Sequence, residues 1–507
     1  MSNRPGVRLA WTLAAALTAA HCSGAASPRG SGGSGGDGGD GGGAETGGQG
    51  GSATGGKSGG TGGAGTGGAA TGGDNGTGGS TGGKGGSTGG SGGMGTGGAT
   101  GGAGGEIEPP PPMNEPPLPP CKNTVQVAGA GALGGALSAA KAGDCLVLAD
   151  GDYPAPTIAA KGTADAPVVV RAANKLKVNM NGVVKLDAAS YVVLEGFTFP
   201  GGSGTSVGGS ADHIRVTRSR YNSGSAHFEG TAHDNRVDHC EFGPKGTDGN
   251  LVQPTGMSTN TRIDHNYLHD VSAAGGNGRE TVRLGCCGAT FDYHDTGNIV
   301  EHNLFVNCSG EAEMISIKSS ANIVRYNTVR NSNGNISLRA GRHNTIYGNY
   351  VFGTGNQGGI RMYEDDHKIY NNYIATGSAL IANRVDAIHA EVKRAIIVNN
   401  TFLGSVALTG TGNVFANNIT SAAPSIGGAT GGNNLTADAA GLMKMGEVMV
   451  ITTGSKAIDA SMGSYPFVMD DVNGQPRNKP DIGADELSTA PALYGPLTPK
   501  DVGPDAP

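Results

Sequence analysis

The sequence has little charge and few aromatic side chains. Charged residues make up 15% of its 507 positions and aromatic residues 5%, whereas glycine contributes 95 residues. Averaged over the chain, this composition would indicate a low-complexity protein. The glycines are unevenly spread, however, because positions 31–105 contain 42 of them and the other 432 positions only 53. We therefore expect a disordered Gly-rich tract attached to a folded body.

Other absences narrow the class of protein further. The glycine tract lacks a strict Gly-X-Y period, which excludes collagen. The formal net charge is −7, so nothing in the overall balance favours a nucleic-acid partner or an anionic membrane. Long hydrophobic runs are missing apart from residues 9–20, which are too few to span a bilayer. Because Arg4 and Arg8 precede it, this run is typical of a secretory signal, and we expect an exported monomer.

Composition divides the chain into four segments. A signal peptide is expected at residues 1–22 and a disordered linker, first Gly-rich and then Pro-rich, at 23–120. The folded body is expected at 121–487 and a Pro-rich tail at 488–507. The linker is long enough to hold the body away from a cell surface, and a plain secretion spacer is an equal alternative.

The seven cysteines bear on export as well. Cys22 directly follows the apolar run, in the position of a lipidation cysteine, but His21 before it is unusual for that motif. A lipid anchor through Cys22, as in an outer-membrane lipoprotein, and plain cleavage near Ala26 both stay open. The six remaining cysteines permit disulfides in an exported chain. We predict a bridge between Cys121 and Cys145 at the start of the body.

A repeat within the body predicts the fold. A short apolar strand ending in Asn plus an apolar residue recurs at intervals of 37, 24, 22, 23, 28 and 18 residues, at Asn266, Asn303, Asn327, Asn349, Asn372, Asn400 and Asn418. A spacing near 22–24 without helical periodicity is typical of one coil of a parallel β-helix. We therefore predict an all-β fold, a single-stranded right-handed parallel β-helix. Asparagines at equivalent turns are expected to form a structural amide ladder.

Alternation within the coils places four cations on one outer face. The segments TVRLG, ISIKS, NISLRAG and GGIRMY put apolar side chains inward and leave outward Arg283, Lys318, Arg339 and Arg361. These residues are 35, 21 and 22 positions apart, so we expect them nearly in one column. Such cations, about 5 Å apart, repel by about 1–3 kcal/mol per neighbouring pair. The pattern favours a groove for a linear polyanion over a face neutralised by acidic neighbours or solvent.

Oxygen-bearing side chains accompany the cations. Glu311 and Glu313 lie seven and five residues before Lys318, and Asn277 lies six residues before the preceding cation. We expect the three to converge across adjacent coils. Hard oxygen ligands without His or Cys are typical of a Ca²⁺ site, so these residues are predicted to hold Ca²⁺.

Several segments also carry a resemblance: NGRETVRLG (277–285), EAEMISIKSS (311–320), LRAG (338–341) and GGIRMYEDDHKIYNNYI (358–374). Together with GDCLVLADGDY (143–153), they look like the polysaccharide lyase family that holds chondroitinase B and β-helical alginate lyases. The resemblance covers residues 121–487. It implies Ca²⁺ on the Asn and two Glu named above, with Lys318 and Arg339 performing the chemistry. One departure is Ala340, where the family often has His.

The implied reaction is β-elimination on a uronate. Ca²⁺ neutralises the carboxylate beside C5, and Lys318 removes the C5 proton because neighbouring cations favour its neutral amine. Arg339 stabilises the charge that develops or helps to protonate the leaving oxygen. Arg283 and Arg361 are expected to bind carboxylates or sulfates of neighbouring sugars. Alginate, as polymannuronate, is favoured slightly over dermatan sulfate.

Two other classes stay open at this point. A glycoside hydrolase on the same fold needs a pair of carboxylates, for which Asp365–Asp366 and Asp470–Asp471 are available but away from the Lys and Arg. A non-catalytic glycan-binding surface protein is favoured over the hydrolase by the long linker and by Ala340. Chelator-sensitive formation of an unsaturated product separates the lyase from both.

Overall fold

The computed structural model describes residues 120–273, 278–285, 293–353, 358–385 and 389–507. The expectations for residues 1–119, including Cys22, and for Asn277 lie outside the described residues. Within this part of the chain, no helix has both the length and the apolar character needed to cross a membrane.

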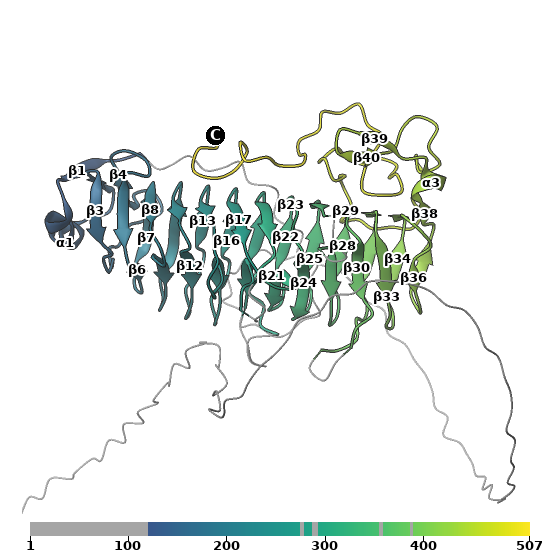
Figure 1. Cartoon of the computed structure of the whole chain (residues 1–507), viewed down its shortest axis with the longest axis horizontal. Helices are drawn as coiled ribbons and strands as arrows, with labels where there is room; N and C mark the ends of the chain where they lie inside the picture. The colour runs from purple at the N-terminus through teal and green to yellow at the C-terminus, as the bar shows by residue number, and fades with distance from the viewer. Residues whose placement is uncertain (1–119, 274–277, 286–292, 354–357, 386–388) are drawn as a thin grey trace, which may run out of the picture. The chain divides into compact units, whose positions relative to one another are not determined.

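Nearly all strands belong to three parallel sheets that extend along one β-solenoid (Figure 1). The 14-stranded sheet contains β1 (Asn123–Val127), β2 (Asp144–Leu148), β4 (Val168–Ala172), β7 (Ser190–Glu195), β10 (Asp212–Thr217), β13 (Arg236–Asp238), β16 (Arg262–Asp264), β19 (Ile299–Glu301), β22 (Ile323–Arg325), β25 (Thr345–Tyr347), β28 (Lys368–Tyr370), β31 (Ile396–Val398), β34 (Val414–Ala416) and β37 (Thr430–Gly432). The 13-stranded sheet contains β3 (Gly151–Pro154), β5 (Val178–Asn181), β8 (Phe197–Phe199), β11 (Arg220–Tyr221), β14 (Glu241–Phe242), β17 (Tyr267–Val271), β20 (Leu304–Cys308), β23 (Thr328–Arg330), β26 (Tyr350–Phe352), β29 (Tyr373–Ala375), β32 (Thr401–Phe402), β35 (Ile419–Thr420) and β38 (Leu435–Thr436). The 11-stranded sheet contains β6 (Val183–Leu186), β9 (Gly204–Val207), β12 (Ser225–Phe228), β15 (Val252–Pro254), β18 (Val282–Leu284), β21 (Glu313–Lys318), β24 (Asn335–Ala340), β27 (Ile360–Met362), β30 (Ser378–Ala382), β33 (Ser405–Leu408) and β36 (Ser425–Ile426).

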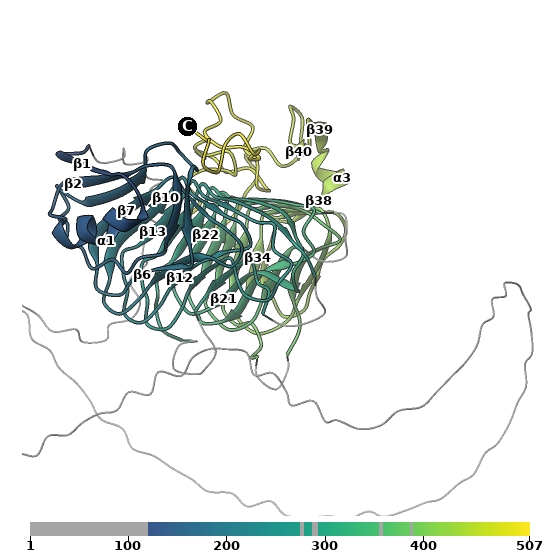
Figure 2. The same ribbon diagram turned by 60° about the vertical axis from the view of Figure 1, so that its left-hand side comes forward.

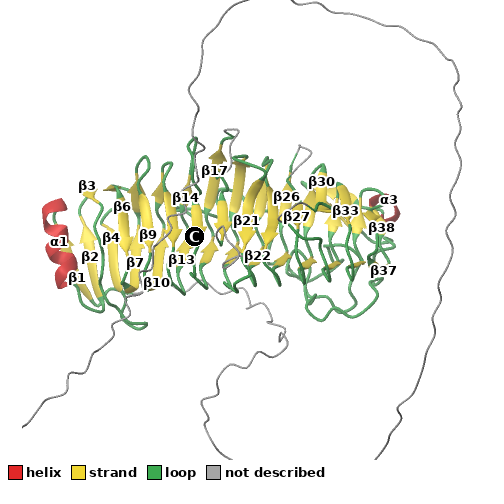
Figure 3. Ribbon diagram, turned by 90° about the horizontal axis from the view of Figure 1, so that it is seen from below, coloured by secondary structure: helices red, strands yellow, loops and turns green. Residues whose placement is uncertain are grey.

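From β4 to β36 each coil contributes one strand to each sheet, so strands adjacent in a sheet come from successive coils. This arrangement confirms the predicted parallel β-helix. Helix α1 (Ala130–Ala139) and helix α3 (Ala437–Ala440) lie at opposite ends of the solenoid (Figure 3). The hairpin of β39 (Met443–Met445) and β40 (Val448–Val450) follows α3. Leu133 of α1 is buried against the first coils and covers the end of the core.

The predicted asparagine ladder is present inside the turns. In successive coils the side-chain amide of one Asn donates to the side-chain oxygen of the next, at 3.0 Å from Asn303 to Asn327 and 2.9 Å from Asn349 to Asn372. The asparagines from Asn266 to Asn418 are almost completely buried. Because buried amides without partners would be costly, the ladder explains why Asn recurs at this turn.

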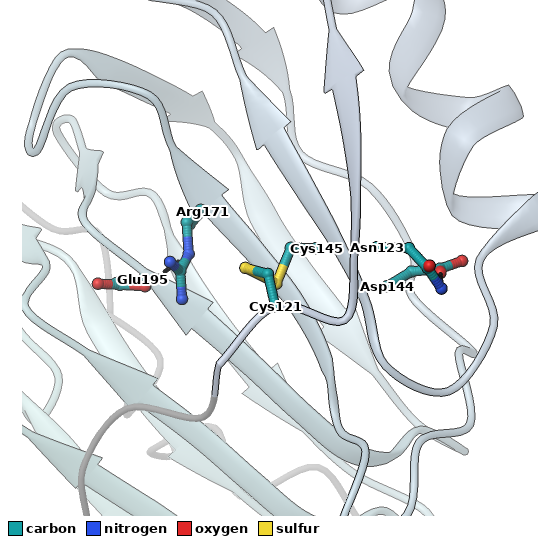
Figure 4. Close-up of a disulfide and its surroundings, with 6 residues drawn as sticks. All are labelled: Cys121, Asn123, Asp144, Cys145, Arg171 and Glu195. Atoms are coloured by element: carbon teal, nitrogen blue, oxygen red, sulfur yellow. Dashed lines mark hydrogen bonds and ion pairs between the residues drawn. A yellow bond between two sulfur atoms is a disulfide. The ribbon is translucent and has the colours of Figure 1, made fainter.

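The predicted disulfide between Cys121 and Cys145 is confirmed (Figure 4). The bridge connects Cys121, just before β1, with Cys145 in β2. Strands β1 and β2 also pair in parallel through their backbones. Nearby, Asn123 donates to the Asp144 carboxylate at 3.0 Å, so the first coil is fixed by a covalent bond and a hydrogen bond.

The Pro-rich C-terminal segment, residues 488–507, packs along the solenoid. Figures 1 and 2 show it in yellow, running back over earlier coils. The Leu497 N–H donates to Thr328 Oγ1 at 2.8 Å, and the Gly503 N–H donates to the His265 carbonyl at 2.8 Å. Arg218 donates to the carbonyl of Ala506, a residue close to the C-terminus, at 2.7 Å. The segment therefore links coils that are far apart in the sequence.

Candidate active site

Four consecutive strands of the 11-stranded sheet, β18, β21, β24 and β27, form the scaffold of the site. Their apolar side chains are fully buried in the core, namely Val282, Leu284, Ile315, Ile317, Ile336, Leu338, Ile360 and Met362. The alternating side chains therefore face outward on one side of the sheet. The predicted alternation is confirmed, and it places Arg283, Lys318, Arg339 and Arg361 on a common face.

The four cations do not form one column. Backbone pairing aligns Arg283 with Ser316, Ser316 with Ser337, and Ser337 with Arg361. Lys318 pairs with Ala340 instead, after register shifts between β21 and β24. The prediction of a single column is therefore wrong. Arg283 and Arg361 end one line that has two serines between them, which keeps like charges apart in the sheet.

Three carboxylates converge on this face, from Glu280, Glu311 and Glu313. One oxygen of each lies within 4.8 Å of the other two. Glu280 and Glu313 are buried and Glu311 is half-buried. The sequence predicts the meeting of Glu311 and Glu313, whereas Asn277, the third predicted ligand, lies outside the described residues. Three hard oxygen donors without His or Cys fit the Ca²⁺ that the resemblance implies.

Glu280 connects the carboxylates to Lys318. Lys318 Nζ lies 2.8 Å from Glu280 Oε1, and Asn250 Nδ2 donates to Glu280 Oε2 at 2.7 Å. Burial on its own would raise the pKa of Glu280, but the charge and hydrogen bond of Lys318 outweigh it and lower that pKa. Glu280 is therefore ionised, and it fixes the position of the Lys318 ammonium.

Glu313 is shared by two arginines. Arg361 donates from Nη2 to Glu313 Oε1, and Arg339 Nε lies 3.3 Å from the same oxygen. The Ser316 hydroxyl donates to the other oxygen. Arg361 also donates from Nε to Ser337 Oγ at 2.9 Å. One carboxylate is thus the shared counter-charge of two guanidinium groups, and Arg361 is almost entirely buried in this arrangement.

Glu311 is the least compensated carboxylate of the three. Its Oε2 accepts backbone N–H groups from Gly278 at 2.7 Å and Arg279 at 3.3 Å. Burial raises the pKa of Glu311, and the charge of Glu280 raises it further. Among the described residues, no Lys or Arg forms an ion pair with Glu311. The cluster therefore carries negative charge that a bound cation would stabilise.

Arg283 retains an unsatisfied donor. Its side chain is 9% exposed, and within the described part of the chain its Nε has no hydrogen-bond partner. Buried donors of this kind are costly unless a ligand or water satisfies them. Arg283 is consequently suited to bind an anion beside the carboxylate cluster.

Sequence reasoning missed Glu280, although a signal for it exists. Val282 pairs with Ile315 and Arg283 with Ser316, an offset that places Glu280 opposite Glu313. Matching Arg283 with Lys318 shifts the alignment by two residues, which leaves every side chain on its correct face and so hides the error. With the observed offset, Glu311 is opposite Gly278, whose N–H it accepts.

The carboxylate pairs considered for a hydrolase have other partners. Asp365 and Asp366 both contact the guanidinium of Arg394, at 3.0 and 2.7 Å. Asp471 accepts backbone N–H groups of Asn473 and Gln475, each at 2.8 Å. These contacts give both pairs a structural role.

Comparisons with known proteins agree with this geometry. The sequence model of the chondroitinase B family matches residues 127–419. A mannuronic acid specific polysaccharide family 6 lyase from the human gut microbiota is 26% identical, with a TM-score of 0.50, and the match covers 62% of this chain and 82% of that one. The family 6 alginate lyase AlyGC is 24% identical, with a TM-score of 0.56, covering 74% of this chain and 60% of AlyGC. A family 6 polysaccharide lyase from Pseudopedobacter saltans is 21% identical, with a TM-score of 0.56, covering 75% and 99%. No curated protein matches the sequence.

Proposed function

Because the chain belongs to the chondroitinase B family and is a polysaccharide lyase, we propose that it cleaves alginate rich in mannuronate by Ca²⁺-assisted β-elimination. The observation that carries this proposal is the convergence of Lys318 and Arg339 on three carboxylates on one face of the solenoid. Alginate is favoured because the 26%-identical structure is a mannuronic acid specific lyase.

The cation would be held by Glu280, Glu311 and Glu313, together with Asn277 as the resemblance implies. When bound, Ca²⁺ supplies positive charge to the uronate carboxylate, which makes the proton at C5 more acidic. The protein's own contribution is to place donors and a base around that carbon. Its buried cluster also keeps the charged groups out of bulk water, where their interactions would be weaker.

Lys318 is the proposed base. In the structure Lys318 Nζ lies 2.8 Å from Glu280 Oε1, and only the neutral amine can take a proton from C5. A cation held by Glu280 would compete with Lys318 for that carboxylate. Glu280 would in this way connect the cation site to the proposed base.

The arginines have separate proposed tasks. Arg339 is 29% exposed and lies at the entrance to the cluster, where it stabilises developing negative charge or protonates the leaving oxygen through an adjacent water. Arg283 and Arg361 bind carboxylates of the sugar chain, since the guanidinium fork matches a planar anion. The line from Arg283 to Arg361 follows the axis of the solenoid, along which a linear polyanion would lie.

The test is ultraviolet absorbance of the unsaturated product. Purified protein is incubated with polymannuronate, polyguluronate and dermatan sulfate, with Ca²⁺ and with chelator. Lys318→Ala is expected to lower the rate on the preferred polymer by about 10²- to 10⁴-fold, as removal of a general base does. Lys185→Ala is the matched control, because Lys185 is exposed on the same sheet near the N-terminal end. An unaltered rate in Lys318→Ala would contradict the assignment.

Two alternatives are decided by the same assay. A product from dermatan sulfate alone would favour the activity of chondroitinase B, whose family model matches this chain. No product from any polymer would favour a non-catalytic glycan-binding protein, for which Ala340 next to Lys318 is the structural argument.

We also propose that the protein is exported, either anchored to a membrane or released. The signal at residues 1–22 and the Gly-rich linker support secretion, with a lipid anchor through Cys22 or release after cleavage near Ala26. Radiolabelled fatty acid incorporated by the full chain but not by Cys22→Ala would establish the anchor. A labelled Cys22→Ala protein would exclude it.

A further inference from the structure

Tyr363 lies directly behind the two arginines that share Glu313. Its ring centroid is 5.9 Å from the guanidinium carbon of Arg339 and 5.8 Å from that of Arg361. Tyr363 itself is 3% exposed. It follows Met362 of β27, which pairs with Leu338, so Tyr363 is next to Arg339 in the adjacent coil. One ring therefore contacts both guanidinium groups.

A second ring supports Tyr363 from the next coil. The imidazole of His389 packs against the Tyr363 ring with centroids 4.6 Å apart and a tilt of 38°. His389 is 6% exposed. The Tyr363 ring therefore contacts two guanidinium groups and an imidazole, and its orientation is restricted by packing.

The arrangement matters because Glu313 has two competing tasks. In the structure Glu313 Oε1 contacts Arg339 and Arg361 together. Once Glu313 binds a cation, its charge is shared with that cation and both guanidinium groups lose much of their counter-charge. The Arg361 side chain is 9% exposed, so water cannot replace the lost interaction fully. Another group must keep the arginines in place.

We propose that Tyr363, backed by His389, is a positioning residue that holds Arg339 and Arg361 toward the substrate when Glu313 turns to a cation. An aromatic face attracts a guanidinium electrostatically and by stacking, and it does not compete for the metal. The inference rests on the proposed function. It explains how one carboxylate could serve a metal without releasing Arg339, which is assigned to the reaction, or Arg361, which is assigned to sugar binding.

The experiment measures binding in the absence of turnover. A mannuronate hexasaccharide is titrated calorimetrically into Lys318→Ala protein that carries either Tyr363 or Tyr363→Leu, with Ca²⁺ and with chelator. With Ca²⁺, Tyr363→Leu is expected to weaken binding by about 5- to 30-fold, the range of partly buried cation–π contacts. With chelator, Glu313 still holds both arginines, so the same substitution is expected to change the affinity by less than about 2-fold.

Conservative variants separate the ring from its hydroxyl. Tyr363→Phe is expected to keep the affinity in Ca²⁺, and in otherwise wild-type protein it should keep KM and kcat. Tyr363→Leu should raise KM with a smaller loss in kcat. The matched control is Tyr191→Leu. Tyr191 lies on another sheet, away from the site, and its ring stacks on that of His213 with centroids 4.1 Å apart. Tyr363→Met replaces Tyr363→Leu if the latter melts below the control.

Several outcomes would overturn the proposal. Equal weakening with Ca²⁺ and with chelator would show that Tyr363 only supports the fold. An unchanged affinity in Tyr363→Leu, or an equal loss in Tyr363→Phe, would remove the role of the ring. In each of these cases formation of unsaturated product by the wild type leaves the proposed function intact. A protein that binds no uronate chain under either condition and forms no product would overturn both.

Discussion

Two clusters of buried charge on this solenoid behave in opposite ways. On the 14-stranded sheet, Asp238, Asp264 and Glu301 occupy one line of successive coils and are interleaved with arginines. Arg215 contacts Asp238 at 2.6 Å, Arg236 contacts Asp264 at 2.5 Å, and Arg325 contacts Glu301 at 2.6 Å. We refer to these six residues as the ion ladder. The second cluster is the group of Glu280, Glu311 and Glu313 on the 11-stranded sheet.

The difference lies in how completely each carboxylate is neutralised. Burial would raise the pKa of Asp264, but Arg236 and His265 outweigh it, and the pKa is lowered. The pKa of Glu311 is raised by burial and by Glu280. The ladder therefore pairs its charges within the fold, whereas in the site Glu311 has no Lys or Arg partner among the described residues. Under the proposed function, buried charge serves stability in the first case and cation binding in the second.

Breaking the ladder gives the largest expected effect. Asp264→Asn leaves Arg236, whose side chain is 12% exposed, beside a neutral amide, with Asp238 at 3.6 Å as its remaining carboxylate. This change is expected to destabilise the fold by about 3 kcal/mol, the lower end of the range for a broken buried ion pair. Melting followed by circular dichroism measures the change, with exposed Asp165→Asn as the control. A loss no greater than that of the control would mean that the ladder is not a stabilising element, and the contrast between the clusters would fail.

Removing a carboxylate from the site should leave the stability of the fold unchanged or raise it, and should lower the activity. Glu311→Gln removes a charge that burial and Glu280 disfavour, so the melting temperature in chelator should stay the same or rise. Lyase activity in Ca²⁺ should fall by about 100-fold or more, as it does when one electrostatic group of an active site is lost. Glu229→Gln is the control, since Glu229 is exposed on the same sheet after β12. Lower stability together with normal activity would contradict the assignment of Glu311.

The sequence was sufficient for features that repeat and insufficient for those that do not. The strand alternation and the asparagine ladder follow from period and spacing, because each coil imposes the same requirement on its residues. The relative position of Arg283 and Lys318 does not, because loops of different length separate the coils and a two-residue slip preserves the face of every side chain. That slip concealed Glu280. Tyr363 gave no signal either, since its role depends on an imidazole from the next coil.

The pH dependence of stability is the smallest of the expected effects, and it tests the surroundings of the ion ladder. His302 stacks between His265 and Tyr326 beside the ion ladder, at centroid distances of 5.1 and 5.2 Å. Burial, followed by the nearby charges of His265 and Arg325, lowers the pKa of His302 to about 3 from an ordinary value of 6.5. The folded form binds a proton at His302 less readily than the unfolded chain does. The free energy of unfolding is therefore not reduced by His302 above pH 6.5, and it decreases as the pH falls from 6.5 toward 3.

The expected loss from His302 between pH 7 and pH 5 is about 2 kcal/mol. His302→Phe keeps the ring in the stack but cannot be protonated, so its melting temperature should fall less steeply over that interval. Both proteins are melted in chelator, which keeps the metal site from contributing. Glu229→Gln serves again as the control and should follow the wild type. Parallel curves for wild type and His302→Phe would place the acid sensitivity elsewhere, and a steeper curve for His302→Phe would reverse the sign of the argument.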